Sequence, residues 1–270
     1  MPELPEIRHL AKQMDHALKG RCIADVEIRQ EKCLNVPVAR FRELVEGKAV
    51  AGCRYLGKWV FTELAPEAWL LLNLGMGGDA RLHKPGEALP ETYQACFHFE
   101  DGGALTLRFW WFGYIHAASA HELPSHKMTA DLGVDPLDPK AFTPEAFAAL
   151  LKGRRGAIKQ LLLDQRRIAG IGNVYAQDSL FMAGIDPRRA IPSLSDDDIQ
   201  RLHRAIAEHL SEAARLGGLE FERDLYGKPG GFSAFKVGYR EGQSCPECGT
   251  AIEKVKTGST SSFICPVCQV

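Results

Sequence analysis

The sequence predicts an α+β fold with several domains: an N-terminal helix and an antiparallel β-sandwich, then a helical domain with a C-terminal zinc ribbon. Three patterns carry this prediction. Short β-type runs fill residues 21–120, helical patterns fill residues 143–214, and two Cys-x2-Cys pairs lie close to the C-terminus. A chain of 270 residues is long enough for two domains, each with its own core.

Domain boundaries follow from changes in composition along the chain. We expect a β-sandwich domain at 1–122, a linker rich in Pro and Asp at 123–142, a helical domain at 143–238 and a four-cysteine ribbon at 239–270. No apolar run approaches the roughly 20 residues that a membrane helix needs. The N-terminus lacks a signal-peptide pattern, so we expect a reducing, cytoplasmic location.

The elements of the first domain are predicted from spacing. Apolar residues recur at helical intervals over 5–18, where Pro5 suits the first turn and Gly20 a stop. Turn signals such as Asp101-Gly102-Gly103 separate the strands that follow. The strands are predicted over 22–28, 49–55, 59–64, 69–72, 95–99 and 104–111.

The helical half begins at Thr143, a predicted N-cap with Pro144 in the first turn. Residues 218–238 hold five glycines and one proline, and we expect a mobile loop there. Helices are predicted over 144–151, 155–163, 173–183 and 193–214.

Four cysteines form the strongest motif. Cys245 and Cys248 make one hook, and Cys265 and Cys268 make a second after sixteen intervening residues. Four thiolates at this spacing in a reducing compartment predict one tetrahedral, structural zinc rather than disulfides. A ribbon is usually a staple for a hairpin that lacks a core, but its tip at 256–260 also offers donors to a phosphate.

Charge is unevenly distributed. The net charge of −1 argues against a non-specific polyanion binder, yet six cations accompany one acid between residues 152 and 173. Within that stretch, the turn Gly170-Ile171-Gly172-Asn173 would aim backbone N–H groups and the Asn173 amide at a phosphate. Taken alone, a Gly-x-Gly turn is weak support, and Lys159 is equally consistent with a solvated face.

The N-terminus offers amine chemistry. Removal of Met1 would leave Pro2 with a secondary amine, and its attack on a sugar C1′ gives an iminium that acts as an electron sink. Glu3 is adjacent and could supply the acid that opens the sugar ring. Glu6, in the first helical turn, is explained as well by the helix dipole. By itself, a lone terminal proline is more often a disordered tip.

Two loops could carry apolar wedges. Met76, in a glycine-rich turn over 73–78, either packs in a core or enters a base stack when a nucleotide is extruded. The aromatic run 108–113 would bury two rings by alternation, which leaves Phe112 as the second candidate. Lys58 follows a glycine in a short hairpin and by itself is a surface lysine.

Together, these motifs resemble those of the formamidopyrimidine-DNA glycosylase and endonuclease VIII family of bifunctional DNA repair glycosylases, and most closely its formamidopyrimidine branch. The resemblance runs from one end of the chain to the other. It is carried by residues 2–6, Lys58, residues 73–78 and 110–113, a helix–two-turn–helix over 158–176, the loop 227–230 and the four cysteines.

The resemblance implies a DNA glycosylase (an N-glycosyl hydrolase) of base excision repair with abasic-site lyase activity. It would remove oxidised bases through a Schiff base on Pro2 and cleave the abasic site by β,δ-elimination. Glu3 would donate a proton and Lys58 would bind the flanking phosphate. The implied partner is double-stranded DNA with a damaged base or abasic site. The protein itself would be monomeric and associated with the nucleoid. The residues implied to contact DNA are Asn73, Met76, Phe112, Lys159, Asn173 and Thr260.

Three positions depart from the family pattern. Thr260 and Trp110 stand where the family has arginines that bind phosphates and probe the base opposite the lesion, and Asn73 replaces a histidine. A hydroxyl donates a weaker, neutral hydrogen bond. An indole can stack but cannot pair bidentately, so selectivity for the opposite base should relax or change. These departures leave open an alternative, a non-catalytic binder of damaged or distorted DNA with the same fold.

Overall fold

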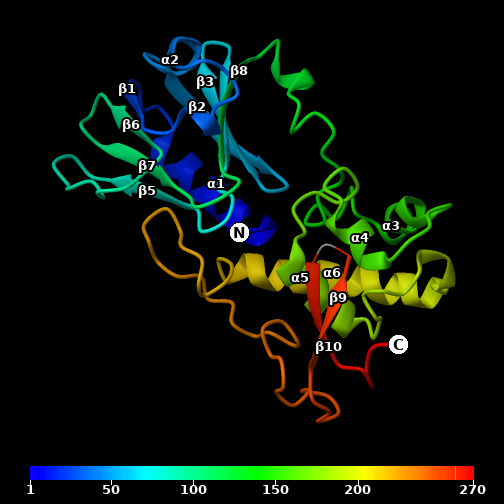
Figure 1. Ribbon diagram of the computed structural model, residues 1–270. Helices are drawn as coiled ribbons and strands as arrows, with labels where there is room; N and C mark the ends of the chain where they lie inside the picture. The colour runs from blue at the N-terminus through cyan, green and yellow to red at the C-terminus, as the bar shows by residue number, and fades with distance from the viewer. Residues whose placement is uncertain (259) are drawn as a thin grey trace. The chain divides into compact units, whose positions relative to one another are not determined.

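A computed structural model describes residues 1–258 and 260–270 of the chain. It divides into two compact units (Figure 1). The first unit comprises Met1–Asp131 and Leu216–Gly231, and the second unit comprises Leu132–Arg215 and Phe232–Val270. The segment Leu216–Gly231, placed in the helical domain from the sequence, therefore joins the β-sandwich.

The first unit is an antiparallel β-sandwich, as predicted. Its strands are β1 (Ile23–Ile28), β2 (Ala49–Leu56), β3 (Trp59–Ala65), β4 (Ala68–Asn73), β5 (Asp79–His83), β6 (Ala95–Phe99), β7 (Ala104–Arg108) and β8 (Tyr114–Ser119). One four-stranded sheet has the order β2-β3-β4-β8 and the other β1-β6-β7-β5 (Figure 1). Buried apolar residues of both sheets form one continuous core.

Helix α1 (Leu4–Leu18) packs against β2 of this sandwich. The apolar spacing seen in the sequence places one face in the core, with Ile7, Leu10, Met14 and Leu18 all buried. Burying each such side chain contributes roughly 1.5–3 kcal/mol, so packing rather than intrinsic propensity fixes the position of the helix.

Five elements of the first unit were not expected from the sequence. They are the short helix α2 (Val38–Val45), the strands β5 and β8, and the 3-10 helices η1 (Glu31–Cys33) and η2 (Leu123–Ser125). The strand expected over 104–111 ends at Arg108, and Phe112, with a left-handed φ of +56°, lies in the loop before β8. Strand β8 includes His116, whose polar ring hides the strand from a purely apolar pattern.

The segment Leu216–Gly231 is packed and ordered by hydrogen bonds, although its glycines suggested mobility. Leu219 and Leu225 are fully buried. The backbone N–H of Leu82 in β5 donates to the carbonyl of Leu225 at 3.0 Å. Gln13 of α1 accepts a hydrogen bond from the Leu225 N–H at 3.0 Å. This segment therefore closes over α1 and β5.

The second unit is helical, with the four helices expected. They are α3 (Pro144–Leu151), α4 (Ile158–Leu163), α5 (Asn173–Met182) and α6 (Asp196–Arg215). The predicted N-cap is confirmed, since the Thr143 hydroxyl accepts a hydrogen bond from the Ala146 N–H at 3.1 Å. Within the described residues, none of these helices is both long and apolar enough to cross a bilayer.

Buried polar groups tie the C-terminal part of the second unit to α5. The carboxylate of Asp178, which is fully buried, accepts hydrogen bonds from the backbone N–H groups of Lys236, Val237 and Gly238 at 2.8–3.0 Å. A two-stranded hairpin follows, formed by β9 (Glu253–Thr257) and β10 (Thr260–Ile264). The chain thus reaches its ribbon through a polar anchor, and a small apolar cluster that includes Phe181 of α5 and Ile252 packs beside the cysteines.

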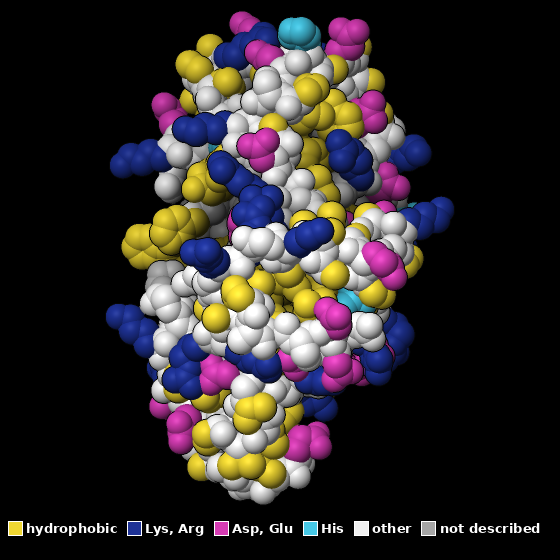
Figure 2. Space-filling model, turned by 90° about the vertical axis from the view of Figure 1, so that its right-hand side faces the viewer, with side chains coloured by type: hydrophobic (Ala, Val, Ile, Leu, Met, Phe, Trp, Pro, Cys, Tyr) yellow, Lys and Arg dark blue, Asp and Glu magenta, His cyan; other side chains and the backbone are white. Residues whose placement is uncertain are grey.

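Charges are mixed over the surface. On the face drawn in Figure 2, Lys and Arg side chains are interspersed with Asp and Glu, in keeping with the net charge of −1. Any affinity for a polyanion must therefore come from particular sites rather than from the field of the whole molecule.

Candidate functional site

The N-terminus is built into the first unit and is not a free tip. Pro2, Glu3 and Glu6 are all buried. The Glu3 N–H donates to Glu6 Oε2 at 2.7 Å, as part of a capping box at the start of α1. Glu6 Oε1 also accepts a hydrogen bond from the Leu219 N–H at 3.0 Å. Glu6 therefore anchors the N-terminus, in line with its structural interpretation.

A further carboxylate meets the terminal amine. The ammonium of Met1 lies 3.3 Å from Glu222 Oε1. Burial raises the pKa of the Glu222 carboxyl, the terminal ammonium opposes this rise, and Glu3 and Asp79 add to it. Sequence reasoning missed Glu222, because it lies in a glycine-rich stretch more than 200 residues away in the chain.

Lys58 and Asn73 lie at strand ends of the first unit. Lys58 is half-buried in the turn between β2 and β3, after Gly57 with a φ of +58°. Asn73 ends β4, and its Oδ1 accepts a hydrogen bond from the Gly75 N–H at 3.1 Å. The Asn73 oxygen thus shapes the glycine-rich turn, while a contact of this residue with DNA stays a prediction.

Four apolar side chains stand in solvent at the ends of two paired loops. Met76 is 45% exposed, Trp110 71%, Trp111 65% and Phe112 69%. We call these four residues the aromatic tip. An antiparallel bridge joins Met76 to Trp111 and holds the two loops together. The expectation that two rings of this run are buried is met only by Phe109, which is 5% exposed.

Lys159 is 1% exposed, contrary to the solvated face considered from the sequence. Its ammonium donates to Thr257 Oγ1 at 3.0 Å, Thr260 Oγ1 at 3.0 Å and Ser262 Oγ at 2.6 Å. It also lies 3.1 Å from the Ser261 carbonyl oxygen. Lys159 and Thr260, two of the predicted site residues, are therefore in direct contact. Ser259 of the predicted hairpin tip lies outside the described residues.

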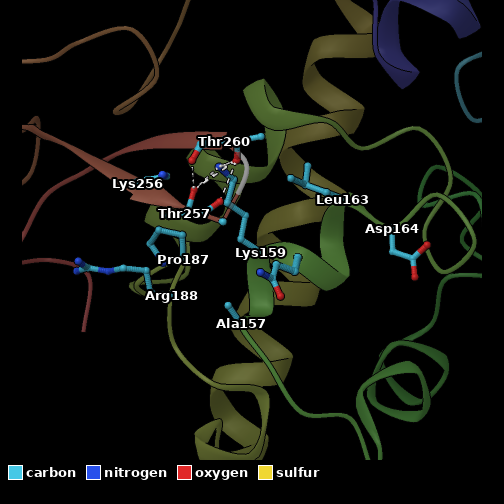
Figure 3. Close-up of a pocket in the computed structure, with 11 residues that line it drawn as sticks. Ala157, Lys159, Leu163, Asp164, Pro187, Arg188, Lys256, Thr257 and Thr260 are labelled. Atoms are coloured by element: carbon cyan, nitrogen blue, oxygen red, sulfur yellow. Dashed lines mark hydrogen bonds between the residues drawn. The ribbon is translucent and has the colours of Figure 1, made fainter.

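A pocket of about 390 Å³ adjoins this lysine (Figure 3). Figure 3 shows the Lys159 side chain reaching toward Thr257 and Thr260. The pocket has a mixed polar lining with several hydrogen-bond donors. Its polar and charged lining residues are Lys159, Gln160, Asp164, Arg188, Lys256, Thr257 and Thr260.

Asn173 begins α5, directly after Gly172. Its Oδ1 is buried and has no hydrogen-bond partner within the described residues. The turn before it is braced by Gln165, whose side chain accepts from the Gly170 N–H at 2.8 Å and donates to the Ile171 carbonyl at 2.8 Å. Gln165 is a positioning residue that the sequence did not single out.

The four cysteines form a metal site within the second unit. Their sulfur atoms all lie within 4.8 Å of one another. The Sγ atoms of Cys245 and Cys268 are 3.8 Å apart, and those of Cys248 and Cys265 are 3.5 Å apart. A tetrahedral zinc with Zn–S bonds of about 2.3 Å requires S–S separations of about 3.8 Å, so the residues present fit the ion.

Comparison with known proteins decides the family. The formamidopyrimidine-DNA glycosylase N-terminal domain matches residues 1–109, its H2TH domain matches 132–223, and a zinc finger found in FPG and IleRS matches 242–270. Formamidopyrimidine-DNA glycosylase from Laribacter hongkongensis is 35% identical and covers 100% of both chains. The Moorella thermoacetica protein of that name is 37% identical and covers 95% of both.

The chain belongs to the formamidopyrimidine-DNA glycosylase family.

Solved structures of the family share the fold. Lactococcus lactis Fpg (MutM), in a complex with DNA containing N7-benzyl-Fapy-dG, superposes with a TM-score of 0.92 at 27% identity over 99% of both chains. The MutM (Fpg) protein from Thermus thermophilus has a TM-score of 0.89 at 32% identity, covering 99% of this chain and 98% of that one. A complex of Lactococcus lactis Fpg with abasic-site DNA has a TM-score of 0.88 at 27% identity.

The comparisons confirm the predicted family, the fold class and one structural zinc. The structure brings predicted residues together in three places. In the first unit, Pro2 and Glu3 lie in one buried N-terminal turn, and the loops of Met76 and Phe112 are paired. In the second unit, Lys159 holds Thr260. The catalytic and DNA-binding roles of these residues stay predictions.

Proposed function

We propose that this formamidopyrimidine-DNA glycosylase family member is a DNA glycosylase of base excision repair that also cleaves abasic sites. In this proposal, Met1 is excised, the Pro2 amine attacks C1′ of the damaged nucleotide, and β,δ-elimination follows. The observation that supports it best is the buried turn of Pro2 and Glu3, where the Met1 ammonium of the unprocessed chain lies 3.3 Å from the Glu222 carboxylate. Relatives have been solved with Fapy-dG, oxidised-pyrimidine and abasic-site DNA, and we propose that class of duplex as the substrate.

Each buried acid has a proposed task. The Pro2 amine must lose its proton before it attacks C1′, and we assign this proton to Glu222, whose carboxylate lies 3.3 Å from the Met1 ammonium in the unprocessed chain. The glycosidic bond then breaks, the base leaves, and Glu3 protonates the sugar ring oxygen as the ring opens to the iminium. Loss of a C2′ proton expels the 3′ phosphate, and a second elimination expels the 5′ phosphate.

The remaining predicted residues would hold DNA. Lys58 at its turn would bind the phosphate beside the lesion, and so would Asn173, a half-buried residue at the start of α5 whose Oδ1 has no hydrogen-bond partner within the described residues. We propose that Lys159 acts through the hairpin that it supports, since its ammonium donates to the Thr260 hydroxyl that lines the pocket of Figure 3. The structural zinc, when bound, holds the hairpin in place and takes no part in the reaction.

Borohydride trapping on abasic-site DNA tests this proposal. Processed protein, shown by mass spectrometry to begin at Pro2, should form a covalent adduct and nick the strand. A matched version with extra residues ahead of Met1 keeps Pro2 in an amide bond, so it should bind an abasic analogue but give neither adduct nor nick. Full nicking by the extended version, or excision by processed protein without an adduct, would contradict the Pro2 mechanism.

The same assay decides the alternative, a binder without turnover. A neutral Thr260 in the hairpin and a lysine buried beneath it favour a weaker grip on phosphate than an exposed cation would give. Specific binding of abasic DNA by processed protein, with no cleavage at any lesion, would establish that alternative.

A further inference from the structure

The aromatic tip is an exposed apolar surface that folding of the chain does not require. Three of its four side chains are about two-thirds exposed or more, which is unusual for Trp and Phe. Contiguous exposed apolar surface of this kind marks a place where a partner binds. Two of its residues, Met76 and Phe112, are also the predicted wedges for a base stack, which indicates a nucleic acid as the partner.

The backbone beneath the tip is held rigidly. The Met76 N–H donates to the Trp111 carbonyl at 2.8 Å, and the Trp110 N–H donates to the Met76 carbonyl at 2.9 Å. Below it, the Gln94 side chain pairs with both backbone groups of Phe109, at 2.8 and 3.0 Å. Exposed rings on such a scaffold lose little conformational entropy when they bind.

Glycines let the two loops interlock. A Cβ on Gly77 would lie 2.6 Å from Cδ2 of the Trp110 ring, so this indole rests on the Gly77 backbone. Phe112 has a left-handed φ of +56°, an outlier for a bulky aromatic residue. An observed backbone outlier of this kind, maintained in a braced loop, indicates a functional constraint rather than a packing need.

Cations lie close to the base of the tip. Asp79, two residues after Gly77, is half-buried and lies opposite Arg108 in the β5–β7 register. Burial raises the pKa of its carboxyl, and the charges of Arg81, Arg108 and Arg223 lower it. Arg108 and Arg223 are exposed. Exposed guanidinium groups next to apolar rings match a nucleic acid strand, whose phosphates and base faces need those two kinds of contact.

The chemistry of these four side chains limits which features of a base they can recognise. Two indoles, a phenyl ring and a thioether offer flat apolar faces, and each indole has one N–H donor. Reading the edge of a base requires a paired set of donors and acceptors, such as a guanidinium or a carboxamide provides. Stacking accepts every base, because each base has a π face.

We propose that the aromatic tip is a stacking platform, with Trp110 as the specificity-determining residue, that accepts any base opposite the lesion. This chain would then act on damaged bases in duplex DNA regardless of which base lies opposite. The inference rests on the proposed glycosylase function, and it names the substrate class of that same site.

An opposite-base panel tests the inference. Single-turnover excision of Fapy-dG is measured opposite dA, dC, dG and dT, opposite an abasic site, and in single-stranded DNA. The four rates opposite a base should agree within about fivefold, whereas an edge-reading contact would spread them by about 5- to 150-fold. Opposite an abasic site and in single-stranded DNA the rings have no base to stack on, so excision should be slower. A preference of more than about tenfold for one opposite base, or equal rates with and without an opposite base, would overturn the inference.

Variants locate the effect. Trp110→Leu should slow excision by about 5- to 150-fold, equally opposite all four bases, because one stacking contact is lost. Trp110→Arg should introduce a preference for one opposite base. Met128→Ala, an exposed residue elsewhere in the first unit, is the matched control and should leave all rates unchanged. A Trp110→Arg protein with the base profile of the original chain would count against Trp110.

A binding readout separates this inference from the glycosylase proposal. With 2-aminopurine opposite a stable abasic analogue, binding should quench its fluorescence through stacking, and Trp110→Leu should remove most of the quenching. Gly77→Ala, which displaces the Trp110 ring, should do the same. Absence of borohydride trapping on abasic DNA would defeat the proposed function, whereas trapping with no quenching would defeat only the stacking platform.

Discussion

In the first unit, the two sheets and α1 pack around one continuous apolar core. Within it, Phe41 and Phe97 are fully buried, and their ring centroids lie 6.4 Å apart. In the second unit, positions just as deeply buried hold Lys159 and Asp178, and four cysteines close the chain. An apolar core loses stability in proportion to the volume removed. A buried polar network fails abruptly, since each lost partner leaves another group unsatisfied.

The largest expected effect follows removal of zinc from the second unit. Cys265→Ser, or removal of zinc by a chelator, should unfold the β9–β10 hairpin, because structural zinc contributes roughly 10–16 kcal/mol of folding free energy in small zinc domains. Hydrogen exchange should show peptides over 253–264 losing protection while β2–β4 keep theirs. Cys22→Ser, at a half-buried thiol of the first unit, is the control. Protection of the hairpin in the absence of zinc would show that its folding does not depend on the metal.

A cavity in the apolar core should be costly for the first unit alone. Phe97→Ala should lower its free energy of unfolding by about 3–5 kcal/mol, and Phe97→Leu by less, because cost follows the volume lost. Denaturant unfolding followed by exchange in β1–β8 measures this effect. If protection in α5 and α6 fell by the same amount, the two units would unfold together, which would contradict this prediction.

Acid should also weaken the first unit. His116 Nδ1 lies 2.9 Å from His126 Nε2 beside the Trp59 ring, and burial followed by the His126 charge lowers the pKa of His116 to about 4. Because the folded state disfavours the protonated ring, stability is intact above pH 6.5 and falls as the pH drops toward 4. The loss should approach about 3 kcal/mol. A pH series of unfolding midpoints measures it, and His116→Gln should flatten the curve. An unchanged slope in that variant would assign the loss to other groups.

The smallest expected effect is that of replacing the buried lysine beneath the hairpin. Lys159→Met should destabilise β9–β10 by about 1–3 kcal/mol, because the hydroxyls of Thr257 and Ser262 lose their buried donor. Lys256→Met, at an exposed lysine of the same hairpin, should change stability by less than about 0.5 kcal/mol. Local hydrogen exchange measures both variants. Equal effects of the two substitutions would show that Lys159 is an ordinary surface cation.

Local patterns in the sequence predicted much of this structure. The apolar spacing of residues 5–18 predicted α1 within one residue, since periodicity reports a single buried face. The Cys-x2-Cys hooks predicted the zinc site, because ligand spacing within each hook is itself local. Pro144 after Thr143 indicated the start of α3 for the same reason.

Features that depend on distant partners were not predictable. The glycines of 216–231 suggested mobility, yet Gly218 takes a φ of +89° so that the chain can pass directly beside Glu6. Lys159 looked like one more cation in a basic stretch, because the hydroxyls that surround it come from a hairpin about 100 residues later. Glu222 was missed since only folding brings it to the terminal amine.

The discontinuity of the first unit has a consequence for biosynthesis. Glu6 receives its hydrogen bond from Leu219, and Gln13 from Leu225, so the start of the chain is seated by residues translated more than 200 positions later. A nascent chain emerging from the ribosome can assemble both sheets but leaves its first turn unfinished until α6 and the following segment have left the exit tunnel. The proposed nucleophile is therefore completed last, when nearly all of the protein is already made.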